Sequence, residues 1–143
     1  MCWNGKCDVK IAKKDIIVYK VGYMFGESFC SLYLNYTYVP KETNKEVKID
    51  PFIYNYNICK ERKKQECIIY TGYHSYKEVS MPYSELGTSS RLVYLGRTVG
   101  RINLFNLYYV ATFIIPKGSE YYENDEGEIV SSNIIYTGKY VKL

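Results

Sequence analysis

Short runs of isoleucine, valine and tyrosine, each ended by a turn signature, recur along this sequence. The clearest runs are residues 16–21, 67–71 and 108–115, and the last of them ends at Pro116-Lys117-Gly118. β-Branched and aromatic residues fit a pleated, half-buried surface, and glycine and proline punctuate such runs. The pattern therefore predicts a domain built mostly from short strands.

Weaker runs of the same kind occur in the rest of the chain. The further strands that we predict are residues 29–36, 51–56, 119–122, 128–130 and 134–136. Ser75, with Glu78 three residues later, matches a capping box, which predicts a short helix that ends before Pro82. Strands with one or two short helices indicate an α+β fold, a β-rich domain with mixed or antiparallel sheets.

Length sets the expected domain organisation. A chain of 143 residues is the size of one domain, and 47% of it is apolar, which is enough for a hydrophobic core. Residues 1–14 are polar and lysine-rich, so we expect them to be a lead-in to a single globular domain of residues 15–143.

Tyrosine is the unusual residue, with 18 copies against 5 phenylalanines and 1 tryptophan. It suits binding surfaces because its ring is rigid and apolar and its hydroxyl is polar, but an AT-rich genome would enrich it without any function. The net charge of +4 falls short of the concentrated basic footprint of a dedicated nucleic-acid binder. The charged run of residues 60–66 is interpreted as a solvated loop or hairpin tip, with a phosphate-contacting patch as the alternative.

The cysteines bear on the compartment and on metal binding. No apolar region follows Met1, which indicates a cytoplasmic protein (host cytoplasm if it is encoded by a phage) whose cysteines are free thiols. No stretch approaches the ~18 apolar residues of a membrane span, so we expect no membrane partner. One histidine and no paired Cys-x-x-Cys spacing predict no metal site. The cysteines are Cys2, Cys7, Cys30, Cys59 and Cys67.

Three places in the chain carry groups that could bind a ligand. His74 follows a predicted strand, where ligand-binding residues often lie, although a lone histidine is more often a structural hydrogen-bonding group. Arg97 and Arg101 each follow a glycine and could hold a phosphate with the guanidinium fork. Glu126 and Glu128 lie in or beside a turn, where they could reach a ribose hydroxyl or simply form an acidic hairpin tip.

The order of the predicted segments resembles the outline of the ADP-ribosyltransferase fold. The resemblance covers about a third of the chain and implies an NAD-binding cleft in an α+β domain. The segments that carry it are Ile17-Val18-Tyr19-Lys20-Val21, residues 71–76, residues 113–118 and Glu126-Gly127-Glu128-Ile129-Val130.

Carried over residue by residue, the resemblance implies roles for individual side chains. Glu128 would be the catalytic carboxylate, Glu126 would orient the acceptor, and Ser75 would support the site. Lys20 stands where the family has arginine or histidine, and a single serine replaces its Ser-Thr-Ser element. These departures imply a cleft that binds without catalysis.

A second resemblance is to small uncharacterised proteins of phages and gut Bacteroidota. It rests on the opening Met-Cys, the segments VYKV and GYHSY, and the ending IPKGSEYY…EIVSSNI. This resemblance implies no activity.

Three functions are open at this point. We expect a non-catalytic binding or modulator protein of phage or mobile-element type, without a cofactor, that acts on a host macromolecule or a nucleotide-like ligand. The first alternative is an NAD-dependent ADP-ribosyltransferase that uses Glu128. The second is single-stranded nucleic-acid binding by tyrosine stacking beside the basic residues of 60–66. The expected ligand-binding residues are Lys20, Tyr73, His74, Ser75, Arg97 and Arg101.

Overall fold

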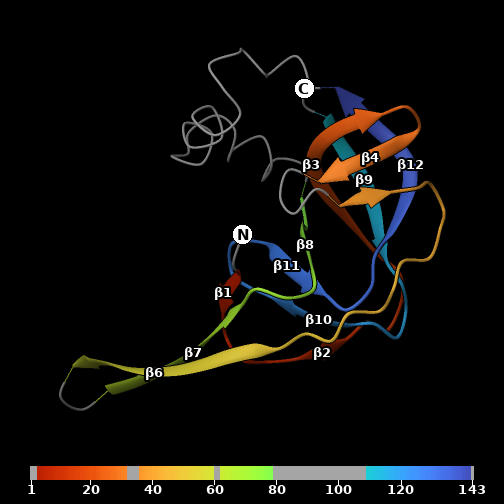
Figure 1. Ribbon diagram of the computed structural model, residues 1–143. Coiled ribbons are helices and arrows are strands. Elements are labelled where there is room, and N and C mark those ends of the chain that lie inside the picture. The colour runs from red at the N-terminus through yellow and green to blue at the C-terminus, as the bar shows by residue number, and fades with distance from the viewer. Residues whose placement is uncertain (1–2, 32–35, 60–61, 79–108, 143) are drawn as a thin grey trace, which may run out of the picture.

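Antiparallel pairing of short strands makes up the regular structure of the residues that the computed structural model describes, 3–31, 36–59, 62–78 and 109–142. The expected α+β class is wrong for this part of the chain, because no residue in it is helical and the strands form an all-β, sandwich-like arrangement (Figure 1). The strands are β1 (Trp3–Gly5), β2 (Lys10–Ile11), β3 (Ile16–Phe25), β4 (Ser28–Ser31), β5 (Thr37–Tyr38), β6 (Pro51–Cys59), β7 (Arg62–Ile69), β8 (Tyr73–Tyr76), β9 (Tyr109–Ile115), β10 (Glu120–Glu123), β11 (Glu128–Ser131) and β12 (Ile135–Lys142).

Strand β3 is the longest of them and joins the parts of the larger sheet. It pairs β9 from Ile16 to Gly22, and its last four residues pair β4. On its other edge Tyr19 pairs Tyr76 of β8. The strand order is β12-β9-β3-β8-β11-β10-β2, with β4 attached to β3 and β5 attached to β4.

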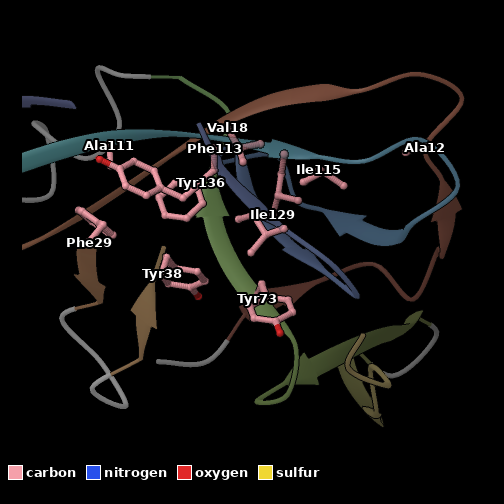
Figure 2. Packing of buried hydrophobic residues seen from close by; sticks show 11 residues of the cluster. Ala12, Val18, Phe29, Tyr38, Tyr73, Ala111, Phe113, Ile115, Ile129 and Tyr136 are labelled. Atoms are coloured by element: carbon pink, nitrogen blue, oxygen red, sulfur yellow. The ribbon is translucent and has the colours of Figure 1, made fainter. Parts of the chain in front are cut away.

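The main hydrophobic core lies on one face of this sheet. Val18 of β3 and Phe113 of β9 point into it, and β4 and β5 bring Phe29 and Tyr38 over them (Figure 2). The ring of Phe113 lies edge-on to both, with centroids 5.4 Å from Phe29 and 4.9 Å from Tyr38. Such edge-to-face pairs add about 1 kcal/mol each beyond burial. Part of the tyrosine content is thus explained by packing.

A second core joins the opposite face of the larger sheet to a three-stranded sheet of order β1-β7-β6. Trp3 is completely buried there, and its indole Nε1 donates a hydrogen bond to the Glu128 carbonyl at 2.9 Å. Cys67 and Ile69 of β7 meet Tyr122 and Val130 in the same cluster. Of the described residues in the stretch expected as a lead-in, 3–5 and 10–11 therefore form strands, and Trp3 is a core side chain.

The hairpin of β6 and β7 extends away from the two cores, as the long ribbon at the lower left of Figure 1 shows. The charged run of residues 60–66 was expected to be a loop or hairpin tip, and for residues 62–66 this expectation is wrong because they belong to β7. Cross-strand pairing with β6 stabilises an extended backbone at these residues in spite of their charge.

Two turns predicted in the last third of the chain, at residues 116–118 and 124–127, are confirmed. At Pro116-Lys117-Gly118 the amide of Ser119 donates to the Pro116 carbonyl at 3.1 Å, and Gly118 has a φ of 90° that side chains disfavour. At the second turn the side chain of Asn124 accepts hydrogen bonds from the amides of Glu126 and Glu128, both at 3.0 Å. Asparagine favours turns by bonding in this way to its own backbone.

The predicted helix at Ser75 is wrong for residues 75–78. Ser75 and Tyr76 belong to β8 and pair Ile129 and Glu128 of β11. Pairing on both edges of β8 uses the backbone groups that a helix would need, so tertiary contacts override the local capping signal.

Cys7 and Cys67 form a disulfide bond, with their Cα atoms 5.2 Å apart. The expectation of free thiols is therefore wrong for this pair, although Cys30 is free. The bond joins the segment between β1 and β2 to β7, across 60 residues of sequence. In the part of the chain described here, no helix is long and apolar enough to cross a membrane.

We predict that Cys7→Ser lowers the free energy of unfolding by about 2–4 kcal/mol, because closing a loop of this length restricts the unfolded chain. Denaturant unfolding of the oxidised proteins measures the change. Cys30→Ser is the matched control, since Cys30 is unbonded and only half-buried, and it should change the unfolding free energy by less than about 1 kcal/mol. Equal midpoints for the Cys7 variant and the wild type would contradict a stabilising bond.

Candidate functional site

A groove of about 580 Å³ opens on the core face of the larger sheet, beyond the edge of the main core. Its floor is apolar and its rim is cationic. The floor is formed by Ile11, Ile16, Tyr121 and Ile129, and the rim by Lys10, Lys13, Lys14, Lys77 and Glu123.

The rim is built where residues 10–15 run alongside β10 and the turn before it. Lys10 pairs Tyr121, and beyond this pair Ala12 exchanges two hydrogen bonds with the turn. Its amide donates to the Ser119 carbonyl at 2.9 Å, and its carbonyl accepts from the Gly118 amide at 2.8 Å. Asp15 then accepts a hydrogen bond from the Lys117 amide at 2.9 Å. These contacts fix the backbone that carries Lys13 and Lys14.

Glu123 is the single carboxylate on the rim and joins two of the lysines. Its oxygens lie 3.0 Å from Nζ of Lys77 and 3.8 Å from Nζ of Lys10. The hydrogen bond and charge of Glu123 raise the pKa of Lys77 above its ordinary value. Since both lysines are more than half exposed, the pairs add little to stability, but they hold two ammonium groups beside the groove.

Lys13 and Lys14 are exposed, and neither has a carboxylate within ion-pair distance among the described residues. Among the described residues that line this concavity there are thus four ammonium groups and one carboxylate. Clustered like charges raise the local concentration of anions, and the apolar side chains beside them can contact an apolar part of a ligand. The arrangement suits an anion with an apolar part.

Three of the predicted ligand-binding residues lie on the core side of the sheet, beneath the packed side chains. Lys20 is 8% exposed, and its Nζ donates to the His74 carbonyl and lies 5.7 Å from the ring centre of Tyr38. Ser75 is 1% exposed. Tyr73 is a core residue whose hydroxyl donates to the Lys45 carbonyl at 2.5 Å.

The remaining predicted residues lie elsewhere. His74 pairs Val130 of the second core, and Glu128 lies two residues before Val130, so both are on the face opposite to Lys20 and Ser75. Glu126 is exposed at the hairpin turn, which is the acidic-tip alternative. Arg97 and Arg101 lie outside the described residues.

Strand alternation therefore separates the groups that the ADP-ribosyltransferase resemblance would bring together. β3, β8 and β11 are neighbours, but Lys20 and Ser75 are on one face and Glu128 is on the other. These side chains do not line one shared cleft.

The buried polar groups at β3 and β8 have unusual electrostatics. Burial lowers the pKa of Lys20 to about 8, because the ammonium loses its hydration and no carboxylate lies within ion-pair distance among the described residues. Burial and the nearby charge of Lys20 lower the pKa of His74 to about 4, so its imidazole is neutral at pH 7. His74 Nε2 and Ser75 Oγ are buried without a hydrogen-bond partner in the described structure.

No cluster of three or more metal-ligating side chains occurs within the described ranges. Sequence patterns do not predict the groove, since Lys10, Lys13 and Lys14 lie in the stretch that is interpreted as a polar lead-in. The signal was the run Lys10-Ile11-Ala12-Lys13-Lys14, but only its pairing with β10 reveals a concave site.

Comparison with known proteins finds no matching family model, no matching curated protein and no matching solved structure. In the residues that the structure describes, the chain is all-β and carries a lysine-rimmed, apolar-floored groove.

We predict that Lys20→Met changes the pH dependence of stability. The unfolded lysine binds a proton up to about pH 10.5 and the folded one only up to about pH 8, so the wild type should become more stable as the pH rises from 8 toward 10.5. The full difference is worth roughly 3 kcal/mol. Denaturant unfolding between pH 7.5 and 9.5, below the range in which unfolded tyrosines ionise, measures it.

Lys20→Met should remove this rise, and Lys48→Met, at an exposed lysine, is the control for the loss of one positive charge. If the unfolding free energies of the wild type and of Lys20→Met change with pH in parallel over this range, Lys20 keeps its charge in the core and the prediction is wrong.

Proposed function

We propose that this chain is a non-catalytic binding module whose groove takes a nucleotide-like, phosphate-bearing ligand. The observation that supports the proposal is the rim: among the described lining residues, Lys10, Lys13, Lys14 and Lys77 stand beside an apolar floor, and Glu123, which pairs Lys10 and Lys77, is the one carboxylate.

The lysines of the rim suit the phosphate part of the ligand. Lysine binds phosphate as a point charge, and several ammonium groups around one concavity can share the charge of a di- or triphosphate. Lys13 and Lys14 are available for this, since Glu123 engages Lys10 and Lys77.

The apolar floor suits the nucleoside part of the ligand. Tyr121 is half-buried there beside Ile11, Ile16 and Ile129, and an aromatic ring with aliphatic neighbours offers a surface for a flat base. A volume of about 580 Å³ is within the usual range for a site that binds one small molecule.

The side chains that line the groove favour binding without catalysis. Within the described part of the chain, the groove is lined by lysine, isoleucine, tyrosine and one glutamate, without histidine, serine or cysteine. Glu123 is already engaged by two ammonium groups, and nothing beside it has the arrangement of a nucleophile and its base.

We predict that Lys13→Glu/Lys14→Glu weakens binding of ATP by at least about 10-fold, because two attractive charges become repulsive, a loss of more than about 1.4 kcal/mol. Isothermal titration calorimetry with ATP and with adenosine measures it, and adenosine should bind more weakly than ATP. The matched control is Lys48→Glu/Lys139→Glu, two exposed lysines outside the groove, which should leave the affinity unchanged.

The proposal is wrong if ATP gives no binding heat at millimolar concentration, or if both double variants lose affinity equally. Titration with an oligothymidylate tests the single-stranded alternative in the same experiment. If the oligonucleotide binds and ATP does not, and the binding weakens steeply with salt, the ligand is a single-stranded nucleic acid and not a small nucleotide.

A further inference from the structure

Three of the four groove lysines lie on one short segment near the start of the chain. Lys10, Lys13 and Lys14 follow β1 by only a few residues, and Lys77 alone comes from elsewhere. The shape and charge of the groove therefore depend on how firmly residues 6–14 are held against the sheet.

The noncovalent contacts of this segment are concentrated at its two ends. β1 pairs β7 through three residues, and the side chain of Asn124 donates to the Asn4 carbonyl at 2.9 Å. At the other end β2 pairs β10 through only two residues at the edge of the larger sheet. Next to this pair Ala12 is buried in the main core and exchanges two hydrogen bonds with Ser119 and Gly118. These contacts hold residues 10–12, and the stretch between Gly5 and Lys10 is where the covalent bond matters most.

The disulfide fastens the chain between these two attachments. Cys7 lies between β1 and β2, and its partner Cys67 is a completely buried residue of β7 in the second core. Cys7 is only half-buried. A completely buried cysteine is thus bonded to a half-buried one on the segment that carries the groove lysines.

We infer that the Cys7–Cys67 disulfide is a redox switch on the groove: its reduction frees residues 6–9, weakens the edge pairing of Lys10 and lowers the affinity for the phosphate-bearing ligand. The inference rests on the proposed function and names the regulation of that same site. The reductant is a dithiol, either a small molecule or a Cys-x-x-Cys protein.

Reduction of the disulfide by the dithiol takes two steps. One thiolate of the dithiol attacks Sγ of Cys7, the more accessible sulfur, so the Cys7–Cys67 bond breaks and Cys67 leaves as a thiolate that takes up a proton. The second thiol of the reductant then displaces Cys7 from the mixed disulfide. The protein gains two electrons and two protons, and the reductant becomes a disulfide.

The reduced thiol of Cys67 can remain in the second core, because a neutral cysteine behaves as a small apolar residue. β3 and β9 pair each other along seven residue positions, and neither contributes a residue to the second core that holds the bond. We therefore expect reduction to loosen the segment while the central strands stay paired.

The experiment compares oxidised protein with protein reduced by dithiothreitol, with ATP as the probe. Calorimetry should show at least 10-fold weaker binding after reduction. Hydrogen exchange measured by mass spectrometry should rise in residues 6–10 and stay unchanged in β3 and β9. Cys7→Ser should bind weakly under both conditions, whereas Cys30→Ser should respond to reduction as the wild type does.

Equal affinity in the two redox states would overturn the inference and leave the proposed function intact. So would a loss of affinity accompanied by faster exchange in β3 and β9, because the effect would then be general unfolding. Absence of ATP binding to the oxidised protein would overturn the proposed function, and this inference with it.

Discussion

The ladder between β3 and β9 is the interaction on which the rest of the structure depends. It places Val18 beside Phe113 at the centre of the main core, and the far end of β3 carries β4 and β5 over that core. On its opposite edge β3 meets β8, and through β8 the strands β11, β10 and β2 that build the groove. Loss of this ladder would separate the core from the groove.

Alternation along the strands decides which side chains can act together. On the core face of β3 and β8, Lys20 and Ser75 are enclosed by packed rings, whereas Lys77, two residues beyond Ser75, reaches the rim of the groove. Glu128 lies on the other face beside the second core. One sheet thus carries buried polar groups and an accessible cationic site on the same face, separated by the edge of the core.

The groove and the second core are connected through the first residues of the chain. Trp3 and the disulfide bind this segment to β7 and β11, and β2 then extends it along β10. The segment is attached by one buried ring, one covalent bond, the short β2–β10 pair and the hydrogen bonds of Ala12 and Asp15. The covalent bond matters most for the stretch between Gly5 and Lys10, where the noncovalent contacts are fewest. A local chemical change can therefore act on a binding surface without involving the central strands.

The sequence by itself determined most of the strands and both turns near the C-terminus, since β-branched runs, Gly118 and Asn124 act through local conformational preference. It misled at Ser75, where a capping signal lost to pairing on both edges of β8. It also could not place Lys10 beside Tyr121 or Cys7 beside Cys67, pairs that are 111 and 60 residues apart. Such contacts, and the face on which a side chain lies, depend on register between distant strands, which only the tertiary structure decides.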